Sequence, residues 1–126
     1  MTEEALRSWL DSYGRAWETR DPEAVVRLFT EDATYQETPF VEPLRGRLAI
    51  ADYWSRATGS HTDVHFGYEL LALDSNQSIA HWWCSFVRPP AKASLKLDGI
   101  FVLRFDGGGR CRSLREWWHR QENQTR

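Results

Sequence analysis

The stretch DGIFVLRFDGGGRCRSLREWW, residues 98–118, decides the fold class of this 126-residue chain. Apolar and polar residues alternate before and after Asp106–Gly109, which is the period of extended strands. An aspartate followed by three glycines supplies the backbone conformations that a tight hairpin turn needs. The pattern therefore predicts two neighbouring antiparallel strands, one at residues 94–105 and the other at residues 111–120.

The middle of the chain continues the same two-residue period. It predicts strands at residues 63–73 and 78–88, separated by the polar turn formers Asp74–Gln77. A proline pair then opens a longer connection to the strand at residues 94–105. The second half of the chain is therefore expected to form a meander of four long strands.

The first half of the chain has the 3.6-residue period of helices. Apolar residues fall three and four apart over residues 6–17, and Thr2 can cap the start of this helix. An aspartate–proline pair at residues 21–22 begins a second helix. A third helix is predicted at residues 47–58, with a short strand at residues 33–38 before it.

Helices at the start and strands at the end predict an α+β fold with an antiparallel sheet. Long strands in a small domain curve, so that one face of the sheet is concave and three helices can cover it only in part. The uncovered end is expected to form a pocket that is mostly apolar, with a few convergent polar groups. The length fits one domain over residues 1–126.

Composition narrows the possible functions and partners. Sixteen basic and 18 acidic residues leave a net charge of −2 without a basic cluster, so a nucleic-acid partner is not expected. The acidic N-terminus lacks the features of a signal peptide, and no apolar run reaches membrane-spanning length. Cys84 and Cys111 fit no metal motif and suit buried thiols in a reducing compartment. A cytoplasmic protein is therefore expected.

Seven tryptophans in so short a chain form the unusual part of the composition. Each could simply fill the core, but a cluster of large rings with one polar N–H each also suits a core that opens onto a cavity. The partner that such a cavity predicts is a small apolar ligand.

The order helix, helix, strand, helix and four strands resembles the nuclear transport factor 2-like superfamily, and more narrowly its SnoaL-like members, labelled after a polyketide cyclase. The stretches that carry the resemblance are Tyr13–Phe29, Glu31–Trp54 and Asp98–Trp118. The resemblance implies the cone-shaped, cystatin-like form of this fold, with three N-terminal helices packed on a curved antiparallel sheet. It does not settle the function, because the fold hosts isomerases, hydrolases, cyclases, dehydratases and non-catalytic binders.

A closer resemblance to the ketosteroid isomerases of this superfamily implies three catalytic residues. Tyr13 stands where those enzymes have the tyrosine that holds an oxyanion, and Glu37 stands where they have the carboxylate base. Asp98 is matched to their protonated aspartic acid, a second donor to the oxyanion. The implied reaction is proton abstraction beside a carbonyl, without a cofactor.

A second set of polar residues on the late strands leaves an alternative open. Lys96 and Asp98 lie two residues apart, and with His119 they loosely resemble the catalytic groups of epoxide hydrolases with this fold. Because Lys96 has the strand parity of Asp98, its charge would favour the ionised carboxylate over the neutral donor.

Strand parity also predicts the pocket lining and an outer face. The residues expected to bind the ligand are Trp17, Tyr35, Trp54, His81, Trp83, Trp117 and His119. The opposite parity carries Trp82, Phe86 and Trp118, an apolar sheet face too large for a monomer to expose. A homodimer through that face is therefore expected.

Metal and phosphate chemistry find little support in the sequence. His61, Asp63 and His65 alternate and could share a strand face that binds a metal, but a solvated strand start is the favoured interpretation. The glycines at 107–109 join two strands and do not open a helix, unlike a phosphate-binding loop. We therefore expect neither a metal nor another cofactor.

Three functions remain open from the sequence. The first is a cofactor-free isomerase or cyclase that acts on an apolar carbonyl compound. The others are a ligand-binding domain without chemistry and a dimeric interaction module. Glu37 and Asp98 discriminate between these classes, because the enzyme needs both carboxyl groups in the pocket near Tyr13 and a binder needs neither.

Overall fold

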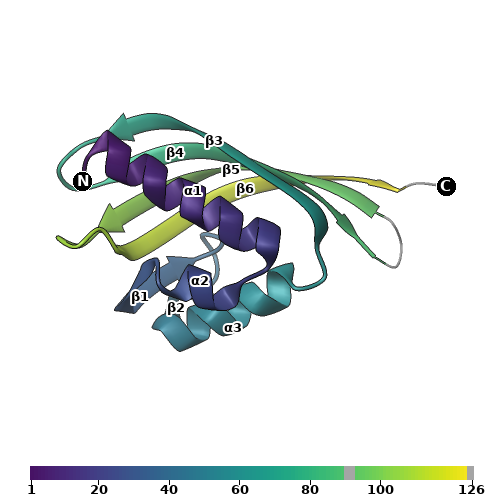
Figure 1. Ribbon diagram of the computed structural model, residues 1–126, viewed down its shortest axis with the longest axis horizontal. Coiled ribbons are helices and arrows are strands. Elements are labelled where there is room, and N and C mark those ends of the chain that lie inside the picture. Colours follow the sequence, from purple (N-terminus) through teal and green to yellow (C-terminus); the bar gives the residue numbers. More distant parts are fainter. Residues whose placement is uncertain (90–92, 125–126) are drawn as a thin grey trace.

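The computed structural model describes residues 1–89 and 93–124, which form three helices and six strands (Figure 1). The elements in chain order are α1 (Glu3–Thr19), α2 (Pro22–Val26), β1 (Phe29–Gln36), β2 (Leu44–Arg45), α3 (Arg47–Thr58), β3 (Thr62–Leu73), β4 (Ser78–Arg88), β5 (Ala93–Phe105) and β6 (Cys111–Gln124). The α+β class and the three N-terminal helices are confirmed. Among the described residues, no helix has the length and apolar character to cross a bilayer.

Short polar side chains start the first two helices as the sequence predicts. The Thr2 hydroxyl accepts a hydrogen bond from the Ala5 amide at 3.1 Å. The Asp21 carboxylate accepts one from the Ala24 amide, also at 3.1 Å, with Pro22 in the first turn of α2. Each bond satisfies a backbone donor that would otherwise lack a partner at the helix start.

All six strands belong to one sheet with the order β2-β1-β6-β5-β4-β3. Strands β3 to β6 pair antiparallel as predicted, but β1 pairs parallel with β6, so the sheet is mixed and not antiparallel throughout. A parallel pair needs a long connection, and here α3 and four strands (β2 to β5) lie between β1 and β6 along the chain. The short strand β2, which pairs with β1, was not predicted.

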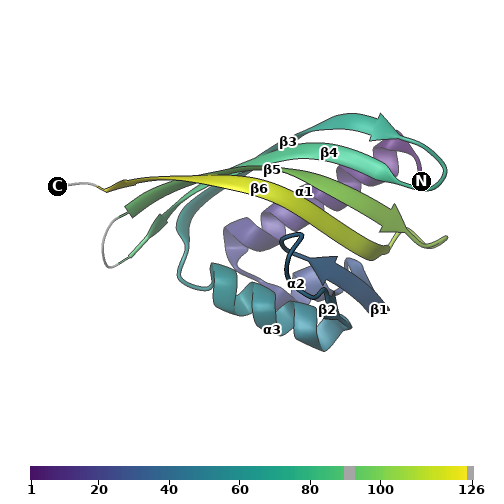
Figure 2. The same ribbon diagram turned by 180° about the vertical axis from the view of Figure 1, so that it is seen from behind.

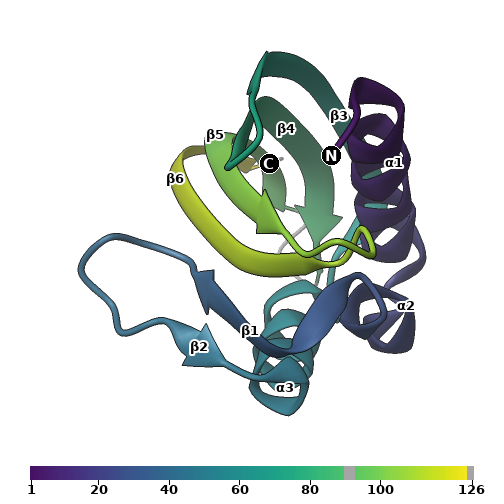
Figure 3. The ribbon, with the colours of Figure 1, turned by 90° about the vertical axis from the view of Figure 1, so that its left-hand side faces the viewer.

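The sheet curves, and the helices lie on its concave side (Figure 3). Helix α1 runs along β3 at one edge, while α3 packs near β1 and β2 at the other. The view from behind shows β3 to β6 with no helix in front of them (Figure 2). The molecule therefore has a covered inner sheet face and a bare outer one.

The inner face is set by burial along the three central strands. On β4 the buried rings are Trp82 and Phe86, whereas Trp83 is 40% exposed on the other side. Trp118 on β6 also packs against the core. The prediction that Trp82, Phe86 and Trp118 form an outer, dimer-forming face is therefore wrong. The predicted alternation holds, but its phase is shifted by one residue.

Gly99 on β5 sits where the inner face is most crowded, between Trp82 on β4 and Trp118 on β6. A Cβ atom at Gly99 would lie 2.7 Å from the Trp117 carbonyl oxygen and 2.9 Å from the Trp82 ring. The backbone oxygen cannot move away without disturbing the β5–β6 pairing. At Gly107, in the hairpin turn, a Cβ would meet no atom within 4 Å.

We expect Gly99→Ala to lower the free energy of unfolding by roughly 1–3 kcal/mol through overpacking. The control, Gly107→Ala, should stay within about 0.5 kcal/mol of the parent. Urea unfolding followed by tryptophan fluorescence measures both. Equal stability of the two variants would contradict the close approach of β6 to Gly99.

Candidate functional site

The concave face closes over a cavity of about 200 Å³ between α1, α3, β1 and the inner faces of β4 to β6. Its wall combines aromatic and aliphatic side chains with polar groups. The apolar lining is Trp17, Trp54, Ala57, Trp82, Phe86, Leu95, Leu97 and Trp118. The polar lining is Tyr13, Tyr35, Glu37, Tyr53, Thr58, His61, Arg88, Glu116 and Arg120.

Four side chains from four elements form one line of hydrogen bonds in this wall. The Tyr35 hydroxyl on β1 donates to Glu116 Oε2 on β6 at 2.9 Å. It also lies 3.2 Å from the Tyr13 hydroxyl on α1, and the Trp54 indole N–H on α3 donates to Tyr13 at 3.4 Å. The line therefore links a carboxyl group to the tyrosine that the sequence singles out.

Burial raises the pKa of the three titratable groups in this line. Desolvation raises the pKa of Tyr13 and of Tyr35 far above the ordinary tyrosine value, with the Glu116 charge as the next cause for both. The pKa of Glu116 rises to about 8, first because the carboxyl group is buried and then because Glu37 is nearby, against the hydrogen bond from Tyr35. At pH 7 both tyrosines and Glu116 therefore hold their protons.

Glu37 lies directly after β1, half-buried in the cavity wall. The Trp118 indole N–H donates to the Glu37 carbonyl oxygen at 3.1 Å and so anchors the backbone at this point. Burial is the largest cause of the raised pKa of both Glu116 and Tyr53, and the Glu37 charge raises both further. The cavity thus contains one buried carboxyl group and one that is partly open to solvent.

His61 occupies another part of the cavity wall. Its Nδ1 accepts a hydrogen bond from the Trp17 indole at 3.2 Å, and its ring stacks on Phe86 with 3.6 Å between centroids. Burial, followed by nearby Arg88, lowers the pKa of His61 to about 4. The imidazole is therefore neutral at pH 7, and because Nδ1 accepts, its proton is on Nε2.

The possible metal site at His61, Asp63 and His65 does not form. His61 is buried at the cavity, whereas His65 and Asp63 are exposed and contact each other at 3.0 Å. The three residues do not share a face, because Asp63 has a positive φ of 52° at the irregular start of β3. Among residues 1–89 and 93–124, no three metal-ligating side chains cluster.

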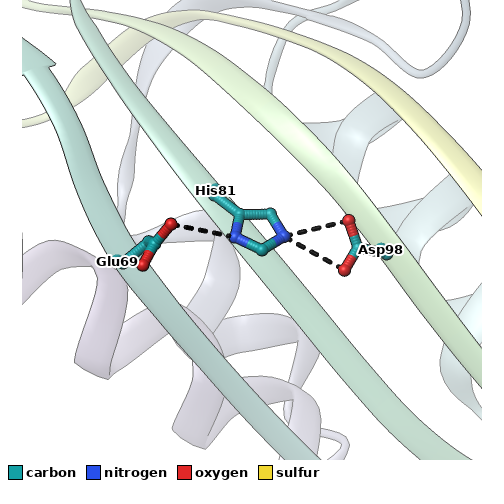
Figure 4. Close-up of polar contacts among 3 residues, drawn as sticks. All are labelled: Glu69, His81 and Asp98. Carbon is teal, nitrogen blue, oxygen red and sulfur yellow. Dashed lines mark hydrogen bonds and ion pairs between the residues drawn. The ribbon is translucent and has the colours of Figure 1, made fainter.

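Asp98 lies on the outer face, away from the cavity, with 67% of its side chain exposed. Both of its oxygens contact His81 Nε2, at 2.9 and 3.0 Å, while His81 Nδ1 lies 3.4 Å from Glu69 (Figure 4). The hydrogen bond to Asp98 is the largest cause of a raised His81 pKa. The predictions that Asp98 converges with Tyr13 and that His81 lines the pocket are therefore wrong.

The outer face also contains Trp83, Trp117 and His119, so the prediction that they line the apolar cavity is wrong for all three. Ile100 pairs with Trp117, and Asp98 pairs with His119 across β5 and β6. The physical reason is the phase of the strands: the neighbours Trp82 on β4 and Trp118 on β6 face inward, so Trp83, Trp117 and His119 face outward.

The alternative set Lys96, Asp98 and His119 does meet, in an open hollow of about 590 Å³ on the outer face. Its members are exposed, so water weakens electrostatic interactions between them. The smaller inner cavity is the stronger candidate site, because its carboxyl and hydroxyl groups are buried and their acidity is shifted.

Sequence reasoning placed Tyr13, Trp17, Tyr35, Glu37 and Trp54 correctly in one cavity. It missed Glu116 and the role of His61. Glu116 could have been found from the hairpin, because it has the parity of Leu114 and pairs with Phe101 on the inner face. No sequence signal indicates that Trp17 would draw His61 inward.

Comparison with known proteins agrees with this architecture. The family model of the SnoaL-like domain matches residues 9–113. A steroid Δ-isomerase of Nocardioides simplex is 26% identical over 97 residues, which cover 77% of this chain and 76% of that protein.

Solved structures show the same fold at low sequence identity. The Δ5-3-ketosteroid isomerase from Mycobacterium sp. superposes with a TM-score of 0.80 at 17% identity, covering 94% of this chain and 98% of that one. SalBIII, an epoxide hydrolase/cyclase-like enzyme in pyran ring formation in the polyether salinomycin, gives 0.79 at 22% identity, covering 94% and 95%. These likenesses establish the nuclear transport factor 2-like fold.

The raised pKa of Glu116 predicts how stability depends on pH. In the unfolded chain this carboxyl group ionises near its ordinary value of 4.5, whereas the folded protein holds the proton up to about pH 8. The unfolded state therefore binds fewer protons between these values, so stability falls as pH rises. Below pH 6.5 the lowered pKa of His61 has the opposite effect and masks this slope.

Between pH 6.5 and 8 we expect Glu116 to lower the free energy of unfolding by about 1.4 kcal/mol per pH unit. Glu116→Gln cannot ionise and should remove this contribution, so the difference between parent and variant should change with pH. Urea unfolding at several pH values measures it. A constant difference across this range would contradict the buried, protonated carboxyl group.

Proposed function

The chain belongs to the SnoaL-like domain family, and from this premise we propose that it is a cofactor-free isomerase or cyclase for a small apolar carbonyl compound. The observation that carries the proposal is that Glu37, a carboxyl group partly open to solvent, shares one apolar cavity with the buried hydroxyl of Tyr13. A base and a hydrogen-bond donor on the same cavity are the two groups that enolate chemistry needs.

In the proposed reaction the Glu37 carboxylate takes a proton from the carbon beside the substrate carbonyl. The electron pair of the broken C–H bond forms a C=C bond, and the carbonyl π pair moves onto oxygen. Tyr13 donates a hydrogen bond to that oxygen as its negative charge develops. An isomerase then returns the proton from Glu37 to another carbon. A cyclase instead lets the enolate carbon attack a second carbonyl of the same molecule, whose oxygen takes the proton.

Cavity size and lining restrict the substrate. The volume of about 200 Å³ is below the roughly 300 Å³ at which ligand pockets usually begin. A compact ligand, or one ring system of a longer molecule that extends through the mouth, fits such a space. The tryptophan and leucine walls favour apolar carbon skeletons and exclude most of the water that would compete for the enolate oxygen.

A ligand-binding protein without chemistry is the second candidate. The observation that favours it is the position of Asp98, which leaves the donor pair implied by the isomerase resemblance incomplete. A binder would use the same cavity but would not need Glu37. The rate of C–H exchange into deuterated water and the affinity for the ligand, measured on the same variants, distinguish the two functions.

We expect Glu37→Gln to lower the rate of C–H exchange into deuterated water by about 10²-fold or more, because it removes the base. Tyr13→Phe should lower it by about 10²–10³-fold, because it removes an oxyanion donor. The assay is proton NMR on a panel of cyclic enones and steroid-like ketones. Asp98→Asn, on the outer face, is the control and should keep the parent rate.

Two outcomes would count against catalysis. Exchange that survives undiminished in Glu37→Gln would remove the proposed base. Absence of exchange across the whole panel, together with measurable binding of panel members, would favour the ligand-binding function.

We also propose that the outer sheet face associates with a second copy of the chain. Trp83 and Trp117 are 40% and 43% exposed there, which is unusual for such large rings on a free surface. The same face carries acidic Glu69 and Asp98 and basic Arg115. A two-fold arrangement can therefore pair the acids of one protomer with the arginine of the other while it covers both tryptophans.

Sedimentation equilibrium at micromolar concentration should report a dimer. Trp117→Lys should weaken it at least about tenfold, since a buried aromatic anchor at an interface contributes on the order of 2 kcal/mol. Leu48→Lys is the control, because Leu48 is also an exposed apolar residue but lies on α3 and not on the outer sheet face. A monomeric parent protein would contradict the proposal.

The protein is further proposed to work in a reducing compartment such as the cytoplasm. Cys84 and Cys111 support this, because both are buried free thiols. Burial raises the pKa of each above the ordinary thiol value, which disfavours the reactive thiolate.

A further inference from the structure

Glu116 is a buried titratable group of the cavity wall that the proposed reaction does not use. It is 6% exposed on the inner face of β6, and ionised carboxyl groups are rarely buried to this extent. Its polar contact is the hydroxyl of Tyr35, which in turn contacts the hydroxyl of Tyr13. A carboxyl group in this position costs stability near neutral pH, which calls for a function.

The protonation state of Glu116 decides which directions the hydrogen-bond line can take. Each tyrosine hydroxyl has one proton to donate, and a carboxyl group has one proton or none. When Glu116 is ionised, Tyr35 must donate to it, and Tyr13 then donates its proton to Tyr35. Tyr13 is left with lone pairs only, so it can accept a hydrogen bond from a ligand but cannot donate one.

The opposite direction begins with a protonated Glu116. The carboxyl group can then donate to the Tyr35 oxygen 2.9 Å away, and Tyr35 can donate to the Tyr13 oxygen at 3.2 Å. The Trp54 indole also donates to the Tyr13 oxygen, at 3.4 Å. With both incoming hydrogen bonds in place, the proton of Tyr13 is free for an acceptor in the cavity.

We propose that Glu116, acting through Tyr35, sets the direction of the Tyr13 hydroxyl, so that the cavity takes ligands with a carbonyl or enolate oxygen while Glu116 holds its proton. This inference rests on the proposed function for the role of Tyr13 as the donor. Glu116 is a positioning residue in this scheme, because it reaches the ligand only through two tyrosines.

The surroundings of Glu116 favour the protonated form. Titratable neighbours face it from α1 (Tyr13), from β1 and the residue after it (Tyr35 and Glu37) and from α3 (Tyr53). On β5 its partner is the uncharged Phe101. Among these groups, the negative charge of Glu37 opposes ionisation of Glu116.

The basic side chains of the cavity do not offset this. Arg88 on β4 and Arg120 on β6 line the cavity, and Arg88 pairs with Glu122 at 2.9 Å. Within the described residues, neither arginine forms a salt bridge with Glu116. The direction that frees the Tyr13 proton is therefore open at neutral pH and is lost as pH rises through about 8, the pKa of Glu116.

The test requires no ligand in its first step. The protein is labelled with ¹³C at the ζ carbon of tyrosine, and the four tyrosine signals are followed by NMR from pH 6 to 10. We expect the Tyr13 and Tyr35 signals to shift together near pH 8. Tyr68, which donates to Asp11 on the surface, is the internal reference and should not follow them.

Two variants distinguish the proposed relay, in which Glu116 acts on Tyr13 through Tyr35, from a purely structural role of Glu116. Glu116→Gln cannot ionise, so both shifts near pH 8 should vanish. Tyr35→Phe cuts the line between Glu116 and Tyr13, so the Tyr13 shift should vanish even though Glu116 still titrates. A Tyr13 signal that does not move near pH 8 in the parent, or that still moves in either variant, would overturn the inference.

A second step measures the consequence for ligands with 2-cyclohexenone as the probe. Its affinity for the parent protein should fall about tenfold per pH unit above pH 8, as expected for one required proton, and should be independent of pH in Glu116→Gln. Parent affinity that stays constant up to pH 10 would overturn the proposed selection. Loss of C–H exchange with the NMR shifts intact would instead remove the proposed function and leave the relay.

Discussion

The packing of one tyrosine ring holds this structure together. Tyr13 on α1 contacts Trp9, Trp17, Trp54, Phe66 and Phe101, with ring centroids between 5.5 and 6.4 Å apart. These rings come from α1, α3, β3 and β5, so the Tyr13 side chain contacts two helices and two strands of the sheet at once. Aromatic pairs at these separations add to the hydrophobic stabilisation of burial. The hydroxyl on the same ring begins the line of hydrogen bonds to Glu116, and the core and the candidate site therefore share a residue.

This shared residue explains why one part of the cavity wall is polar. A tyrosine hydroxyl buried in a core must find partners, and Tyr35 and Trp54 supply them. Tyr35 needs a further partner, and Glu116 provides it. The chain of satisfied groups ends in a carboxyl group whose pKa burial raises to about 8. Burial of Glu116 therefore costs stability near neutral pH, whereas the proposed orientation of Tyr13 requires a Glu116 that holds its proton.

The two faces of the sheet show a different division. The inner face packs against the helices. The outer face carries Trp83 and Trp117, together with His81 and its partner Asp98. Both faces are rich in aromatic rings, so hydrophobicity alone does not tell them apart. This explains why Asp98, His81, Trp83, Trp117 and His119 were assigned to the wrong side, although the strands that carry them were predicted correctly.

The sequence by itself determined the helices, their caps, the four long strands and the α+β class, because local periodicity and turn chemistry act over a few residues. It also placed Tyr13, Trp17, Tyr35, Glu37 and Trp54 in one cavity, with Tyr13 and Glu37 drawn from the family resemblance. Only the tertiary structure decided the phase of β4, β5 and β6, the parallel pairing of β1 with β6, and the burial of Glu116. The physical reason is that alternation fixes the period of a strand, while the choice of inner face depends on which side the helices cover, and that contact joins residues far apart in the chain.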